Sequence, residues 1–166
     1  QVLLPGLVNL HTHAAMSLLR GFADDLPLMR WLSEHIWPAE ARHATPEFVH
    51  AGTLLACAEM LRGGITTFND MYFFPDAAAA AARRLGMRAV LGIIAIEFPT
   101  RYAADADDYL AKGLEIRDAL SGDPLVGFCL APHAPYTVAD KSFEQIVRIH
   151  IEDELQKSAE HHPARA

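Results

Sequence analysis

Two histidines, His11 and His13, are separated by one residue and follow the short apolar run 7–10. Residues i and i+2 of a β-strand point to the same side, so both imidazoles can reach one divalent ion. Imidazole nitrogens bind such an ion at about 2.0–2.1 Å and suit zinc, iron or nickel better than magnesium. The spacing therefore predicts a metal site at the end of a strand, although two unrelated loop histidines also fit the pattern H-x-H.

Further polar residues that could do chemistry come where an apolar strand is expected to end. They are Asn69, Asp70, Glu97 and His133. The carboxyl ends of parallel strands are the ligand-binding edge both of α/β barrels and of open α/β sheets. Open sheets usually bind through a glycine-rich phosphate turn, and neither G-x-G-x-x-G nor G-x-x-x-x-G-K-[ST] occurs in the chain. Nucleotide binding of these two kinds is therefore disfavoured.

The elements that must position these residues alternate along the chain. Thr45 and Pro46 predict a helix start, Asp76 predicts another, and Trp37-Pro38 is expected to end the first helix. Strands are predicted at 7–10, 65–68, 88–96 and 124–131, with a very short fifth at 149–151, and helices at 28–35, 45–61, 76–85, 105–120, 140–148 and 152–158. This order favours a parallel sheet with crossover helices, either doubly wound or part of a (β/α)8 barrel.

The composition limits the class of protein. The chain has 166 residues, of which 51% are hydrophobic, so we expect a single packed domain. Its formal charge of -7 argues against nucleic acid as a partner. No apolar run approaches the ~20 residues of a membrane span, and the start lacks the basic region of a signal peptide. Because Cys57 and Cys129 form no disulfide framework, a cytoplasmic location is expected.

Longer motifs establish a resemblance to a known family. The motif PGLVNLHTH at 5–13 resembles the first-strand signature of the amidohydrolase superfamily. The complete set of motifs resembles the 5-methylthioadenosine/S-adenosylhomocysteine deaminases, in a branch that also holds triazine chlorohydrolases and guanine deaminases. The other motifs are MSLLRG at 16–21, DDLPL at 24–28, WL at 31–32, WPAE at 37–40, GITTFNDMY at 64–72 and APHAPYT at 131–137. The resemblance covers residues 1 to about 148.

The resemblance implies an α/β fold, a partial (β/α)8 TIM barrel of the metal-dependent hydrolase type with about the first five strands. It implies one Zn2+ ion per subunit, for which Fe2+ is an alternative, with His11 and His13 as first-strand ligands and His150 as the strand-five ligand. Glu40 matches the glutamate that binds the substrate's ribose, and His133 matches a substrate-binding histidine after strand four. A small-molecule purine nucleoside and a homodimer or larger assembly are also implied.

The chain departs from the family pattern near its end. The position three residues after His150 holds Asp153 instead of the family's glutamate, and the helix predicted at 140–148 leaves no room to return before a strand at 149–151. A segment is therefore expected to be missing near 148–153, and strands six to eight with their final aspartate have no counterpart. Residues 1–166 are interpreted as one incomplete barrel domain, and the catalytic residues stay unassigned. The chain is then either a true fragment or an excerpt of a longer protein.

We predict zinc-dependent hydrolytic deamination of an adenine nucleoside, such as 5-methylthioadenosine, S-adenosylhomocysteine or adenosine, with release of ammonia. The alternatives within enzymes are a guanine deaminase and a triazine chlorohydrolase, in which water also attacks an electron-poor aromatic carbon. A ribose-binding carboxylate at Glu40 favours the nucleoside. A different class is an inactive fragment that binds metal weakly through His11 and His13.

Overall fold

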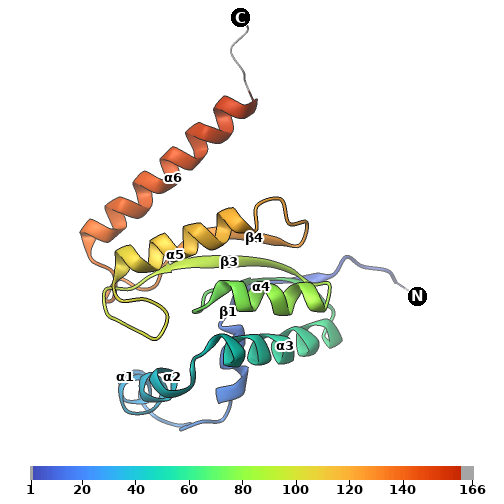
Figure 1. Cartoon of the computed structure of the whole chain (residues 1–166). Coiled ribbons are helices and arrows are strands. Elements are labelled where there is room, and N and C mark those ends of the chain that lie inside the picture. Colours follow the sequence, from blue (N-terminus) through green and yellow to red (C-terminus); the bar gives the residue numbers. More distant parts are fainter. Residues whose placement is uncertain (1, 162–166) are drawn as a thin grey trace, which may run out of the picture.

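The computed structural model describes residues 2–161, in which strands alternate with helices along most of the chain (Figure 1). The strands are β1 (Leu7–Thr12), β2 (Ile65–Asp70), β3 (Arg88–Ala95) and β4 (Val126–Pro132). The helical elements are η1 (Ala14–Leu19), α1 (Leu28–Trp31), η2 (Leu32–Ile36), α2 (Trp37–His43), α3 (Pro46–Arg62), α4 (Pro75–Arg84), α5 (Ala106–Ala119) and α6 (Asp140–His161). Of these, η1 is a 3-10 helix and η2 is a π-helix. The first four predicted strands are confirmed.

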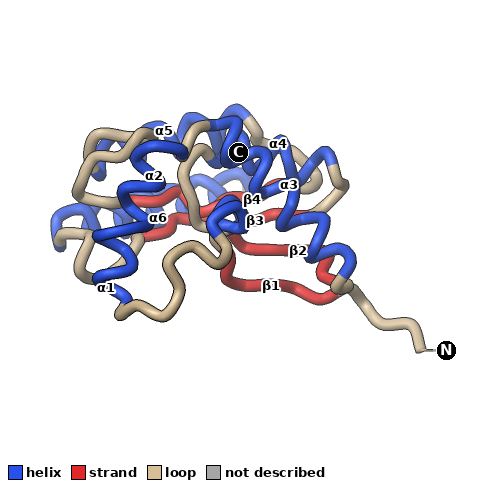
Figure 2. The backbone as a smooth tube through the Cα atoms, turned by 90° about the horizontal axis from the view of Figure 1, so that it is seen from below, coloured by secondary structure: helices blue, strands red, loops and turns tan. Residues whose placement is uncertain are grey.

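The four strands form one parallel sheet in the order β1-β2-β3-β4. Helices α3, α4 and α5 lie along one face of this sheet, above the strands in the view of Figure 2. Parallel strands in chain order with their helices on one face are the arrangement of a (β/α)8 barrel. A doubly wound sheet would instead carry helices on both faces. The structure is therefore a partial TIM barrel.

The hydrophobic core lies between the sheet and the helices that cover it. Tyr109, Phe68 and Met87 are among the largest fully buried side chains. Helix α4 contributes mainly alanines to this core, at 77–79 and 81–82, and all of them are buried. Small side chains allow a helix to approach its neighbours closely, so the alanine-rich segment serves packing, as its composition predicts.

One predicted helix start follows the sequence closely and another differs by two residues. The Oγ1 atom of Thr45 accepts a hydrogen bond from the Phe48 backbone N–H at 3.2 Å, which confirms the predicted cap of α3. Asp76 does not cap α4, because Phe74 occupies the cap position and Pro75 the first helical position, which proline favours. Asp76 lies instead in the first turn, where its charge interacts favourably with the helix dipole.

The first helical segment runs past its predicted end. Elements α1, η2 and α2 follow one another without a break, although the sequence predicts a stop at Trp37-Pro38. A proline has no N–H and crowds the carbonyl four residues earlier in an α-helix. Here the Trp37 N–H donates to the carbonyl of Leu32, five residues back, and this wider π-turn accommodates the proline. The predicted stop is wrong, and the continued helix carries Glu40.

The predicted fifth strand at 149–151 is also wrong. These residues lie inside α6, so the helices predicted at 140–148 and 152–158 are one continuous element. No proline or glycine occurs between Asp140 and His161, and helix propagation is favourable once a helix has started. Ile146 packs against the sheet beside Ile93, and α6 then projects away from the body of the molecule (Figure 1). The described part of the chain therefore holds four barrel strands, not five.

Exposed apolar surface lies where a closed barrel would continue. The described sheet has two edges, β1 and β4, and no further strand pairs with either among residues 2–161. Large apolar side chains are exposed on β1 and, at a spacing of four residues, along α6: Leu7, Val8, Leu10, Phe143, Val147, Ile151 and Leu155. Open strand edges are normally paired or covered, as they are in a complete barrel.

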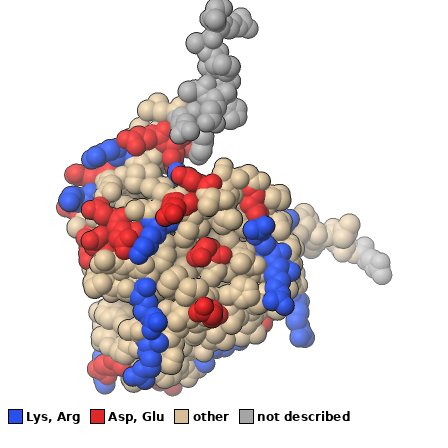
Figure 3. All heavy atoms as spheres, in the orientation of Figure 1, with Lys and Arg blue, Asp and Glu red and all other residues tan. Residues whose placement is uncertain are grey.

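Charged side chains of both signs are interspersed over the face shown in Figure 3. That face lacks the broad basic area that a nucleic-acid backbone requires. Among residues 2–161, none of the helices combines the length and the apolar character that a bilayer crossing requires.

Gly52 marks the closest contact between α3 and η1, which begins directly after His13. A Cβ atom on Gly52 would lie 2.3 Å from the carbonyl oxygen of Ala15. Because backbone atoms cannot turn aside as a flexible side chain can, we expect Gly52→Ala to lower the free energy of unfolding by about 1–3 kcal/mol. Urea denaturation measures this change. Gly127→Ala is the matched control, since nothing lies within 4 Å of its added Cβ, and equal stabilities of the two variants would contradict the contact.

Candidate active site at the carboxyl ends of the strands

A cavity of about 440 Å³ opens at the carboxyl ends of the four strands. This volume lies within the roughly 300–1,000 Å³ of small-molecule sites. Its polar lining includes His13 after β1, Tyr72 after β2, His133 in the turn after β4 and Glu40 from α2. The apolar wall is mostly aromatic and aliphatic, with Trp31, Ile36, Trp37, Ile96 and Phe98 among its members. The cavity therefore offers an apolar space with a few convergent polar groups.

His11 and His13 have the geometry of a pair that can share one ion. Their rings are nearly perpendicular and the ring centroids are 5.1 Å apart. Two imidazoles that bind one ion tetrahedrally at about 2.0–2.1 Å have their centroids about 5 Å apart, so the spacing of the two rings matches that of two zinc ligands. The Nδ1–H of His13 donates to the carbonyl of Met71 at 2.8 Å, which leaves Nε2 free for a metal. Residues 2–161 hold no cluster of three or more metal-binding side chains.

Asp70 holds the backbone on both sides of His13. Its carboxylate is 2% exposed, and Oδ1 accepts hydrogen bonds from the Thr12 hydroxyl and from the Ala14 N–H, both at 2.7 Å. Burial raises the pKa of Asp70, whereas these donors and the charge of His13 act in the opposite direction. Thr12 and Ala14 flank His13 in the sequence. Asp70 is therefore a positioning residue for the segment that carries the histidine.

Glu40 meets Tyr72 at the cavity wall. The Tyr72 hydroxyl donates to Oε1 of Glu40 at 2.8 Å, although α2 and β2 are far apart in the sequence. Burial raises the pKa of the half-buried Glu40 carboxyl, and the hydrogen bond from Tyr72 and the charge of His13 oppose that rise. The sequence analysis did not single out Tyr72. Its position two residues beyond Asp70, just after a strand, is the signal that could have identified it.

His133 is held in one ring orientation by the turn that follows β4. Its Nδ1 lies 2.9 Å from Oγ1 of Thr137, and this hydroxyl donates its own proton to the carbonyl of Ala134 at 3.1 Å. The hydroxyl oxygen therefore accepts from the Nδ1–H of His133. Burial lowers the pKa of His133, and the charge of His13 lowers it further. In the neutral ring with its proton on Nδ1, Nε2 is the free acceptor.

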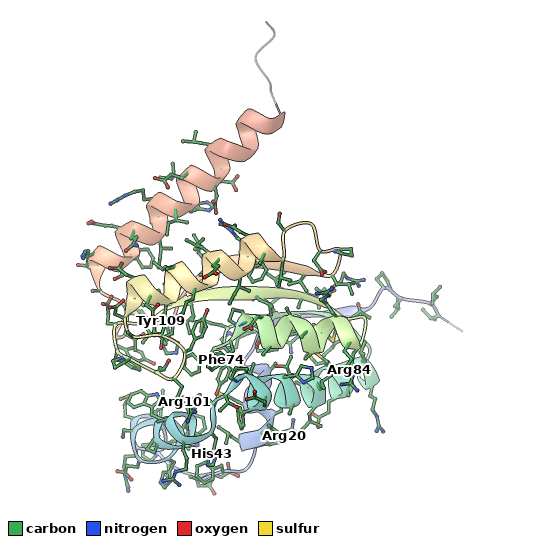
Figure 4. All side chains as sticks on the ribbon, in the orientation of Figure 1. Arg20, His43, Phe74, Arg84, Arg101 and Tyr109 are labelled. Carbon is green, nitrogen blue, oxygen red and sulfur yellow. The ribbon has the colours of Figure 1, made fainter. Side chains whose placement is uncertain are left out.

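Arg101 ties the loop after β3 to α2. Its Nη1 donates to the carbonyl of Arg42 at 3.2 Å, at the end of the helix that carries Glu40. Figure 4 shows Arg101 extending from this loop toward α2. Arg101 also lines the cavity. The sequence carries no signal for this contact, because an arginine in a loop shows no periodicity.

The structure does not bring His150 to the other histidines. It is exposed on α6 and does not line the cavity. Its predicted place beside His11 and His13 depended on a strand at 149–151, and these residues are helical. Of the three histidines predicted as metal ligands, only His13 lines the cavity, whereas His11 is exposed at the end of β1.

Glu97, another polar residue after a strand, serves a helix instead of the cavity. Its Oε1 accepts a hydrogen bond from the Ala139 N–H at 2.8 Å, one residue before α6 begins. A hydrogen bond from the Ser142 side chain and the one from Ala139 lower the pKa of Glu97. Glu97 therefore fixes the start of α6.

Barrels place their reacting groups at the carboxyl ends of the strands. A histidine pair that fits a metal at this edge is the arrangement of a metal-dependent barrel hydrolase. Comparison with known sequences specifies the family: the model of the amidohydrolase family matches residues 2–162, and the chain belongs to this family.

Relatives and solved structures agree with this assignment. The 5-methylthioadenosine/S-adenosylhomocysteine deaminase of Thermodesulfovibrio yellowstonii is 59% identical over 135 residues, which are 81% of this chain and 31% of that protein. The deaminase of the same name from Saccharophagus degradans is 49% identical over 162 residues, 98% of this chain and 36% of that protein. The crystal structure of an adenosine deaminase from Xanthomonas campestris with bound zinc has a TM-score of 0.86 and 53% identity, covering 89% of this chain and 34% of that one. The chain thus spans about a third of the length of the curated relatives it matches.

Proposed function

We propose that this chain supplies the first four strands and half of the active site of an aminohydrolase that deaminates an adenine nucleoside. The substrate is 5-methylthioadenosine, S-adenosylhomocysteine or adenosine, and water replaces the exocyclic amine, which leaves as ammonia. One observation carries the proposal: His13, Glu40 and His133 come from three distant segments and line one cavity. The names of the relatives point to the same reaction.

His11 and His13 hold one zinc ion in this proposal, and iron suits the same ligands. Their perpendicular rings and the hydrogen bond from His13 to Met71 support it. When bound in such a site, the ion supplies an activated water at neutral pH. The carboxylates that move protons in the reaction are not assigned among residues 1–166, since Asp153 lies on α6 and pairs with Arg117.

The remaining groups of the cavity bind and orient the nucleoside. Glu40 accepts hydrogen bonds from the ribose hydroxyls, and its negative charge strengthens them. His133 hydrogen-bonds the substrate through Nε2, the nitrogen that Thr137 leaves free. Trp31 and Trp37 present apolar rings to the cavity, where an adenine base can pack.

We further propose that residues 1–166 are one part of a longer barrel domain whose C-terminal half is supplied by further chain; the continuous helix α6 removes the reason for a gap near 148–153. The exposed apolar surfaces of β1 and α6 and the greater length of the relatives support this proposal. The family resemblance favours a homodimer or larger assembly, and the two unpaired cysteines, Cys57 and Cys129, favour a cytoplasmic location.

The experiment that tests the function measures mass, metal and ammonia on the natural protein. We expect an intact mass well above ~27 kDa, the scale of a barrel of about 250 residues, and close to one zinc ion per subunit. We expect ammonia and loss of the adenine absorbance with 5-methylthioadenosine or adenosine. Ammonia from guanine alone, or chloride from a triazine alone, would favour the related hydrolases. A protein that contains no zinc and releases no ammonia would be the inactive fragment.

A further inference from the structure

We propose that Tyr72 is the positioning residue of the Glu40 carboxylate and that, through it, the site selects nucleosides with both ribose hydroxyls over 2′-deoxynucleosides. This inference rests on the proposed function, because it concerns how the same cavity recognises its substrate. It adds a residue that neither the sequence motifs nor the comparisons assign to binding.

The phenol ring of Tyr72 is rigidly held. The residue is 6% exposed, and its ring lies against Phe73 with centroids 4.9 Å apart. Phe73 in turn contacts Tyr109, which is completely buried in the core. The Tyr72 hydroxyl is therefore fixed relative to the sheet and to the end of β2, where Asp70 and the backbone that accepts from His13 also lie.

The Glu40 side chain, in contrast to the Tyr72 ring, is long and flexible. It lies on α2, in the segment between β1 and α3 that covers the cavity, and its side chain has three rotatable bonds. A long carboxylate on such a helix samples several rotamers unless a partner holds it, and that freedom is lost at a cost on binding. The hydrogen bond from Tyr72 fixes Oε1 at 2.8 Å and so orients the carboxylate before a ligand arrives. Oε2 and the second lone pair of Oε1 stay available as acceptors.

The oriented Glu40 carboxylate is suited to bind a ligand with two adjacent hydroxyl groups. A ribose presents two O–H donors at a fixed separation, and an oriented carboxylate accepts both. A nucleoside that lacks the 2′-hydroxyl makes only one of these hydrogen bonds. Its binding therefore depends less on the orientation of the carboxylate. Burial raises the pKa of Glu40, and both the Tyr72 donor and the His13 charge oppose that rise.

The variant Tyr72→Phe tests the proposal against a matched control, Tyr102→Phe. Both tyrosines are buried in the same core cluster, but the Tyr102 hydroxyl has no hydrogen-bond partner in the described structure. With the natural protein and 5-methylthioadenosine, we expect Tyr72→Phe to raise KM about tenfold, the effect of one hydrogen bond to a charged group, and to change kcat less than about threefold. With the 2′-deoxy analogue, KM should change little. Tyr102→Phe should leave both substrates unaffected.

A second measurement does not depend on turnover. The carboxyl carbon of Glu40, followed by NMR as a function of pH, should show a higher pKa in Tyr72→Phe than in the unsubstituted protein and no change in Tyr102→Phe. If the protein deaminates no nucleoside, the proposed function fails and this titration still decides whether Tyr72 positions Glu40. An unchanged Glu40 titration in Tyr72→Phe overturns the inference, and so does an equal rise in KM for the ribose and deoxyribose substrates.

Discussion

Replacing His13 by alanine is expected to lower the zinc content of the protein from about one ion per subunit to a small fraction and to lower kcat at least about 100-fold. Loss of an outer partner of a metal ligand already costs about 10–100-fold in affinity or activity, and loss of the ligand itself costs more. Two structural features support this large expected effect of losing His13. Its ring stands perpendicular to that of His11 at a centroid distance of 5.1 Å, and Met71 fixes which nitrogen is free.

Metal analysis of the purified variant and its turnover of 5-methylthioadenosine check this prediction together. His43→Ala is the control, because His43 is exposed at the end of α2 and does not line the cavity. A His13→Ala protein that keeps a full complement of zinc and its turnover would show that the metal lies elsewhere. His11→Ala should have a similar effect on zinc content, since both rings face the same ion in the proposed site.

Local signals in the sequence suffice for the elements that position His13. The i, i+2 spacing of the histidines, the β-branched run before Asn69 and the cap at Thr45 each act over a few residues, and the structure keeps all of them. The sequential parallel order of the strands also follows from the alternation of strand and helix. The choice of a barrel over a doubly wound sheet was settled by the family resemblance, and the helices on one face of the sheet confirm it.

Contacts between distant segments could not be predicted from the sequence. Tyr72 and Glu40 are 32 residues apart, and their hydrogen bond exists only because the helix continues through Pro38. That continuation depends on a π-turn, which has no simple sequence signal. At 149–151, a local pattern typical of a strand lies in a segment without a helix breaker, and the helix prevails. Glu97 was expected at the site because it follows a strand. Instead its carboxylate accepts a hydrogen bond at the start of α6, outside the cavity.

Replacing Glu40 by glutamine is expected to raise KM for 5-methylthioadenosine about 10–100-fold, with a smaller effect on kcat. Hydrogen bonds to a charged group are worth about 1.5–3 kcal/mol, and the substitution removes the charge while keeping the size of the side chain. The Tyr72 hydroxyl can still donate to the amide oxygen, so the ribose loses its acceptor without loss of the contact between α2 and the sheet. Glu34→Gln is the control, because Glu34 is exposed and paired with Arg30.

The role of Glu40 also predicts the direction in which KM changes with pH. Burial raises the pKa of Glu40, so the carboxyl takes up a proton at a higher pH than an exposed glutamate does. The protonated form is a poorer acceptor for the ribose hydroxyls, and KM of the unsubstituted protein should therefore rise as the pH falls through this raised pKa. Glutamine does not titrate, so Glu40→Gln should show a high KM without that rise. If the variant keeps the pH dependence of the original protein, the titrating group is another one and Glu40 does not bind the ribose.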